Sequence, residues 1–129
     1  MSDVTPVIEP TIEEWPPFGL TEEPLASGLV LTVSGELDMA TAPDLRERLT
    51  LATDGGAEAL VVDLRRVKFM DSLGLAAILH ARSRLGDGGR LAVVLAPDSY
   101  PHLVFVTAGL PRSLALFESL PEAVAHVTA

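Results

Sequence analysis

The chain has 129 residues, 48% apolar and only 5% aromatic, which predicts one α/β domain with a core built mainly from Leu, Val and Ala. Its formal charge of −9 and its single lysine argue against nucleic acid as a partner, because binding nucleic acid needs clustered basic side chains. The absence of cysteine excludes disulfides and thiol chemistry and suits a cytoplasmic protein, and no apolar run approaches the roughly 18 residues of a membrane span.

The first 17 residues predict a flexible, acidic, proline-rich tail. Residues 1–24 carry six acids, no base and five of the ten prolines, with little periodicity. We therefore expect the folded domain to occupy residues 18–129. Trp15, inside the tail, is expected either to dock on the domain or a partner or to stay exposed.

Two strands and a helix are expected next. The first strand is a short edge strand over 18–23, and the second, over 28–35, is stronger and has glycine at both ends. The helix then starts after Thr41, a natural N-cap, and Asp44 three residues later gives the spacing of a capping box. The sequence TDGG ends this helix.

A buried strand and a second helix meet at Ser72. Residues 58–67 are nearly continuously apolar at their centre, as in a strand buried on both faces, and helical periodicity runs from Ser72 to the GDGG at 86–89. As a helix cap, a serine here stabilises by about 1 kcal/mol. The same position holds an exposed hydroxyl beside backbone N–H groups at the positive end of a helix dipole, where a phosphoryl group is accommodated.

The last third of the chain predicts two more strands and two more helices. Asp98 or Ser99 caps the first of these helices, and Ser119 with Glu122 has capping-box spacing in the second. In chain order these elements are a strand over 90–97, a helix over 98–110, a strand over 113–119 and a helix over 119–129. The complete order β-β-α-β-α-β-α-β-α favours a parallel or mixed sheet with helices packed against it.

A hydrolase is a distant alternative. Ser72, Asp98 and either His102 or His126 follow the chain order of the α/β-hydrolases. Met70, however, replaces the first glycine of the nucleophile elbow, and no oxyanion-hole motif precedes the serine. The histidines also lack metal-ligand spacing, so no metal site is expected.

A phosphate-accepting receiver domain is a second alternative, with Asp63 as the acceptor. Such a site needs further acids to hold Mg²⁺. Only Glu36 and Asp38 are available, and a suitably placed later lysine is missing. A P-loop is excluded because no G-K-[ST] occurs.

The segments SGELDMATAPDLRERL and LVVDLRRVKFMDSLGLAAIL, followed by GGRLAVVLAP, TAGL and LFESLPEAVA, resemble the STAS domain family, specifically the bacterial anti-sigma factor antagonists. The resemblance runs from about residue 18 to 129. It rests on G-E-L-D with its T-A-P and on D-S-x-G, at the expected distance from each other. It implies a single STAS domain whose mixed sheet carries about four helices packed mainly on one side.

The resemblance also implies a partner-switching cycle. In this family the unphosphorylated antagonist binds an anti-sigma factor, a serine kinase of the histidine-kinase-like ATPase fold, and so frees the sigma factor. The kinase then phosphorylates the antagonist, the complex separates, and a PP2C-type phosphatase resets it. The chain is thus expected to be a binding protein without cofactor or enzymatic activity. We expect a monomer, since no exposed apolar stripe is evident in the sequence.

By position in the motifs, Ser72 is the phosphoacceptor and Asp71 flanks it. Gly74 permits the tight strand-to-helix turn, and Asp38 lies in a nearby loop that contacts the kinase. The remaining expected contact residues are Met39, Thr41 and Leu73.

The chain departs from the family pattern at Leu73, where many relatives carry a second hydroxyl. Ser72 is therefore the one residue of this loop expected to accept phosphate. The acidic tail is also outside the pattern. The strongest rival function is a STAS protein that serves another assembly, as a lipid-transport accessory subunit or a sensory scaffold.

Overall fold

A computed structural model describes residues 15–110 and 114–129. Residues 1–14, which make up most of the predicted tail, and residue 113 of the predicted last strand lie outside the described residues. Trp15 is described and exposed. Within the described ranges, no helix is both long and apolar enough to cross a membrane.

Within the described residues, five strands form one sheet in the order β1-β2-β3-β4-β5. Strand β1 is antiparallel to β2, and all the other neighbours are parallel, so the predicted mixed sheet is confirmed. The predicted order of elements is confirmed as well. The elements are β1 (Gly19–Leu25), β2 (Gly28–Leu37), α1 (Ala42–Asp54), β3 (Ala59–Met70), α2 (Ser72–Arg84), β4 (Arg90–Val94), α3 (Tyr100–Thr107), β5 (Ala115–Phe117) and α4 (Leu120–Thr128).

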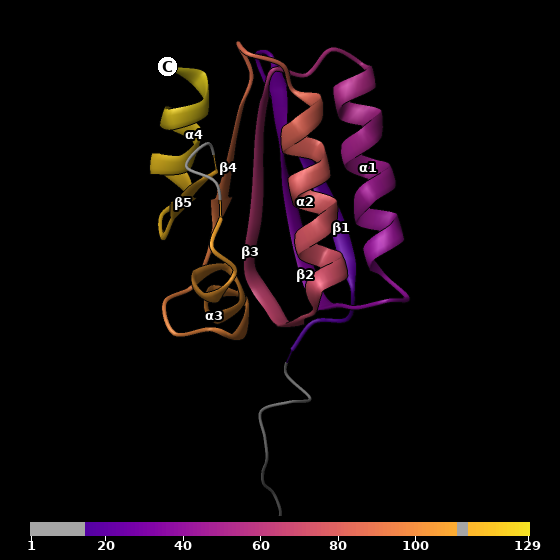
Figure 1. The fold of residues 1–129 in the computed structure, drawn as a ribbon. Coiled ribbons are helices and arrows are strands. Elements are labelled where there is room, and N and C mark those ends of the chain that lie inside the picture. The colour runs from indigo at the N-terminus through magenta and orange to yellow at the C-terminus, as the bar shows by residue number, and fades with distance from the viewer. Residues whose placement is uncertain (1–14, 111–113) are drawn as a thin grey trace, which may run out of the picture.

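The helices cover the two faces of the sheet unequally. Helices α1 and α2 lie side by side on one face (Figure 1), where Leu45 and Ile78 join the larger core cluster, and Phe105 of α3 belongs to the same cluster. Helix α4 covers the other face, where Ala123 and Val127 pack against strand residues in a smaller cluster. Packing mainly on one side is therefore confirmed, with α4 as the exception.

Gly28 allows β2 to start directly beside β3. A Cβ atom at this position would lie 1.6 Å from the carbonyl oxygen of Ala59, the residue it pairs with in the parallel register. No side chain fits in that space, so the close approach of β2 to β3 at this point depends on glycine.

Strand β3 is longer than the sequence predicts. Its pairing with β4 ends at Asp63, but its pairing with β2 continues to Met70, three residues beyond the predicted end. The carboxylate of Asp63 is buried in mid-strand and accepts hydrogen bonds from the Arg65 guanidinium, at 3.0 Å from Nε and 2.8 Å from Nη2. The bond to Asp63 raises the pKa of Arg65, against the lowering effect of burial. Because Asp63 is buried and paired, it is unsuited to accept phosphate, and the receiver alternative loses its acceptor.

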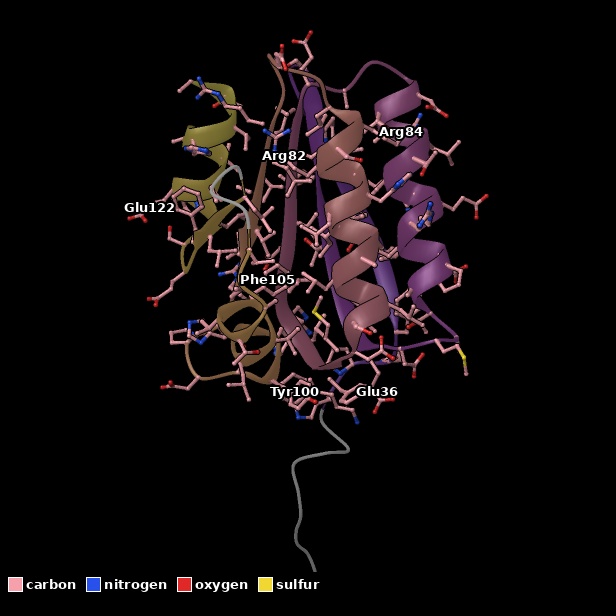
Figure 2. The ribbon with its side chains drawn as sticks, in the orientation of Figure 1. Glu36, Arg82, Arg84, Tyr100, Phe105 and Glu122 are labelled. Atoms are coloured by element: carbon pink, nitrogen blue, oxygen red, sulfur yellow. The ribbon has the colours of Figure 1, made fainter. Side chains whose placement is uncertain are left out.

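Helix α3 exposes an apolar surface, which we call the α3 patch. The ring of Phe69 packs on that of Tyr100 with centroids 5.1 Å apart, and Leu103 and Val106 continue the surface along the helix. Figure 2 shows Tyr100, the first α3 residue of this patch, at the same end of the molecule as Glu36 of β2. The sequence-based statement that no exposed apolar stripe is evident is therefore wrong, and the expectation of a monomer loses the argument on which it rested.

Candidate functional site

The carboxyl ends of β2 and β3 bring two loops of the sequence together. Leu37 pairs with Met70 at the end of the parallel register, and the N–H of Asp71 donates to the carbonyl oxygen of Leu37 at 3.0 Å. The loop over 38–41 thus lies next to the start of α2, although more than 30 residues separate them in the chain. Open α/β sheets typically place their binding sites at this edge.

Asp71, not Ser72, caps α2. Asp71 has extended backbone angles, and its Oδ1 accepts a hydrogen bond from the N–H of Leu73 at 2.9 Å. Ser72 is the first residue of the helix. The prediction that Ser72 is the cap is therefore wrong, because β3 reaches Met70 and leaves Asp71 as the single residue between strand and helix.

The side chain of Ser72 is exposed. Among the described residues, its hydroxyl makes no hydrogen bond. It stands at the positive end of the α2 dipole, with the carboxylate of Asp71 one residue before it. The hydroxyl is thus held on a helix and open to a second protein.

The loop over 38–41 is tied by side-chain hydrogen bonds to the backbone. The Asp38 carboxylate accepts from the N–H groups of Ala40 and Thr41, at 2.9 and 3.2 Å. The Thr41 hydroxyl donates to the carbonyl of Glu36 at 2.7 Å, and its oxygen accepts from the N–H of Asp38 at 2.9 Å. These bonds hold Met39 at the tip of the loop, where the residue is 76% exposed.

Thr41 occupies the N-cap position of α1 without capping it. Its side chain makes no bond to an N–H of the helix, so the predicted capping box with Asp44 is wrong. The physical reason is competition, because the hydroxyl is already engaged by the loop that precedes the helix. Thr41 is thus a positioning residue for the loop.

Gly74 is buried under the start of α2. A Cβ atom here would lie 3.2 Å from the Cβ of Leu37 and 3.3 Å from the Cγ of Met70. Gly74 lies within the helix and is not among the glycines with positive φ. Its role in the tight strand-to-helix turn therefore rests on its small size and not on a positive φ, because the absent side chain lets α2 pack closely on the ends of β2 and β3.

A small pocket, the α1–α2 pocket, opens beside Ser72. Its volume is about 170 Å³. It is lined by Met39, Ala42, Pro43, Arg46, Leu73, Ala76 and Ala77. The sequence predicted Met39 and Leu73 as contact residues, and the structure brings them together at this pocket. It missed Ala76 and Arg46, because neither a small residue nor an exposed arginine in a helix carries a pattern that distinguishes a pocket lining from an ordinary helix surface.

Among the described residues, Ser72 makes no hydrogen bond to Asp98, His102 or His126, so the triad of the hydrolase alternative is not formed. His126 lies on α4, on the opposite face of the sheet from α2, with its ring against Phe117. The Ser99 hydroxyl, as predicted, caps α3 by accepting from the N–H of His102. Residues 15–110 and 114–129 contain no group of three or more side chains that could hold a metal ion.

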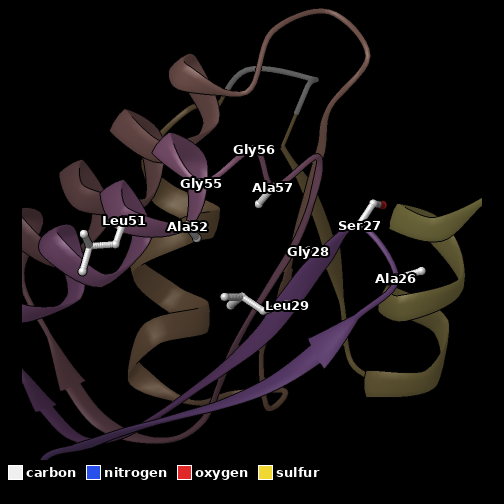
Figure 3. Close-up of a pocket in the computed structure, with 9 residues that line it drawn as sticks. All are labelled: Ala26, Ser27, Gly28, Leu29, Leu51, Ala52, Gly55, Gly56 and Ala57. Atoms are coloured by element: carbon white, nitrogen blue, oxygen red, sulfur yellow. The ribbon is translucent and has the colours of Figure 1, made fainter.

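A second cavity lies at the opposite end of β2 and α1 (Figure 3). Its volume is about 420 Å³, and Ser27, Leu29, Leu51 and Ala52 are among the residues that line it. None of the described residues that line this cavity is charged, and the Ser27 hydroxyl is its polar side chain. The cavity therefore offers a ligand no charged partner, unlike the surface around Ser72, where Asp71 lies.

Comparison with known proteins identifies the fold. The STAS domain model matches residues 20–123. The anti-sigma-F factor antagonist RsfB of Mycobacterium tuberculosis is 32% identical over 98 residues, which cover 76% of this chain and 80% of that protein. The anti-sigma-B factor antagonist of Staphylococcus aureus is 32% identical over 78 residues, which cover 60% of this chain and 72% of that protein. The crystal structure of an anti-sigma factor antagonist from Mycobacterium paratuberculosis superposes with a TM-score of 0.78 at 29% identity, covering 88% of this chain and 96% of that one.

Proposed function

This chain belongs to the STAS domain family, and we propose that it acts as an anti-sigma factor antagonist. Its unphosphorylated form binds an anti-sigma factor and frees the sigma factor. Phosphorylation of Ser72 ends that binding. The proposal draws on the two relatives, both named anti-sigma factor antagonists, with which this chain shares about a third of its aligned residues.

The observation that carries the proposal is the exposed position of Ser72 on the first turn of α2. A phosphoryl group there extends into solvent and leaves the core undisturbed. It adds about −1.5 to −2 charges beside the carboxylate of Asp71 and close to the loop that Asp38 closes. The fold can therefore stay intact while the charge of the binding surface changes.

This change in charge is large enough to work as a switch. An interface that accepts a neutral hydroxyl repels a dianion, and the added charge also has to be desolvated. A loss of a few kcal/mol lowers the affinity by roughly one to three orders of magnitude. Such a difference separates a bound from a released partner at ordinary cellular concentrations.

The partner in this proposal is a serine kinase of the histidine-kinase-like ATPase fold, and a PP2C-type phosphatase removes the phosphate in the cytoplasm. Asp71, Met39 and Leu73 touch the partner directly. Asp38 and Thr41 hold the loop in place. Gly74 sets the position of α2, and with it the position of Ser72.

The test uses the full chain as bait in its own cells. Wild-type protein and Ser72→Ala are expected to capture an anti-sigma factor of the kinase fold, whereas Ser72→Asp is expected to lose it. The purified partner with ATP is expected to add one phosphate to wild type, seen by intact mass, and none to Ser72→Ala. Recovery of transporter subunits or a sensory scaffold, with no kinase-fold protein, would refute the proposal and support the rival function.

A further inference from the structure

The α1–α2 pocket has a size, rim and charge that fit one kind of occupant. We propose that it receives a single apolar side chain of the anti-sigma factor, and that Arg46 at its edge pairs with a carboxylate next to that side chain. This inference rests on the proposed function and specifies how the same surface selects its partner.

The volume of the pocket matches one large apolar side chain. About 170 Å³ is available between the two helices. An apolar cavity of about 150 Å³ is known to hold a benzene molecule, so a leucine, methionine or phenylalanine side chain fits here. The floor is formed by Ala42 and Ala77, which are 4% and 3% exposed, and their small size creates the space.

The rim of the pocket consists of Met39 and Leu73, which are apolar and exposed. Their exposure does not contribute to the stability of the fold. Leu73 is 45% exposed, and Met39 at the loop tip is more so. Fixing a side chain at an interface costs about 0.5–1.5 kcal/mol, and positions already held in the free protein lose less on binding. Here the backbone of Leu73 is held through its N–H by Asp71, and the loop of Met39 is closed by Asp38. The backbone that carries the rim is thus held in place before an apolar side chain is inserted.

Arg46 gives the pocket its charge preference. It is the single charged residue among those lining the pocket, it is exposed, and it forms no ion pair with another described residue. The chain as a whole carries −9, so a free arginine beside an apolar pocket stands out from the surrounding surface. A guanidinium binds a carboxylate with two parallel hydrogen bonds, which favours an Asp or Glu on the partner.

The pocket is also coupled to the proposed switch. Leu73 directly follows Ser72 in the first turn of α2, so a phosphoryl group on Ser72 stands at the edge of the pocket. Water held around the added charge opposes the closure of an apolar contact there. Phosphorylation then acts on the anchoring side chain as well as on the net charge.

The test measures binding of the purified anti-sigma factor, identified as described above, to the unphosphorylated full chain by calorimetry without ATP. Ala76→Met fills the pocket with a residue that suits an exposed helix position. Its matched control is Ala125→Met, the same change at an exposed position of α4 on the other face. Ala76→Met is expected to weaken binding by about 10- to 100-fold, the cost of losing an interface anchor, while Ala125→Met stays within about twofold of wild type.

Arg46→Ala supplies a second readout that does not depend on filling the pocket. It is expected to weaken binding by about 10-fold at low salt and to flatten the salt dependence of the affinity. Equal binding by wild type and Ala76→Met, both folded by circular dichroism, would overturn this inference and leave the proposed function standing. Failure of the wild-type chain itself to bind any anti-sigma factor would overturn both.

Discussion

Exchanging the two residues at the start of α2 for alanine tests which of them caps the helix. Asp71→Ala removes an oxygen that accepts from the N–H of Leu73 at 2.9 Å. Loss of an N-cap typically costs about 0.5–2 kcal/mol, and loss of a negative charge at a helix N-terminus adds about 0.3–1 kcal/mol. We expect Asp71→Ala to lower the free energy of unfolding by about 1–2 kcal/mol. Ser72→Ala is expected to change the free energy of unfolding by no more than about 0.5 kcal/mol. The hydroxyl is exposed, and Ser72 is the first residue of the helix and not its cap.

Urea denaturation followed by circular dichroism measures this difference. In a chain of 129 residues each kcal/mol corresponds to about 3–5 °C in Tm, so thermal unfolding provides a second readout. Asp71→Asn is the control, because asparagine caps as well as aspartate and should recover most of the loss. A cost of about 1 kcal/mol in Ser72→Ala with none in Asp71→Ala would refute the assignment.

Three further substitutions test the fold and the loop. Gly28→Ala is expected to lower the free energy of unfolding by about 3 kcal/mol or more in urea denaturation, because the added methyl group meets the carbonyl of Ala59. A variant as stable as wild type would contradict the close approach of β2 and β3. Thr41→Val removes the two bonds that the Thr41 hydroxyl makes to the backbone and leaves those of Asp38. It should cost about 1–2 kcal/mol and weaken anti-sigma factor binding in calorimetry, whereas unchanged binding would show that the loop does not need the hydroxyl. Arg65→Met leaves the carboxylate of Asp63 buried without its ion pair. It is expected to lower the free energy of unfolding by about 1–3 kcal/mol in the same assay, a range reduced because Arg65 is partly exposed. An unchanged free energy of unfolding would show that the ion pair does not stabilise the fold.

The sequence was sufficient for the order of the elements because each strand and helix has its own periodicity and clear glycine stops. It predicted where α2 begins but not which residue caps it. Aspartate and serine cap helices equally well, and the choice between them depended on three extra residues of β3 pairing, which periodicity does not reveal. The sequence likewise did not show which backbone groups the Thr41 hydroxyl would bond, because both the preceding loop and the first turn of α1 lay within its reach.

Surfaces were harder to predict than elements. Tyr100, Leu103 and Val106 have helical spacing in the sequence, but spacing cannot tell a covered face from an open one. The α1–α2 pocket depends on the lateral packing of two helices that are separated by β3 in the chain. The alanines that line it can be recognised as pocket residues only once that packing is known.

The hydrogen bond from the Asp71 N–H to the Leu37 carbonyl joins the two segments that form the surface around Ser72. This surface therefore does not exist until both segments have folded. The surface is a discontinuous epitope, which forms only after β2, α1 and β3 have come together. A peptide spanning 66–78 contains the serine but neither the loop nor the pocket, and a growing chain on the ribosome lacks them until α2 has emerged. A partner that contacts the whole surface therefore binds only chains in which β2, α1, β3 and α2 have already folded together.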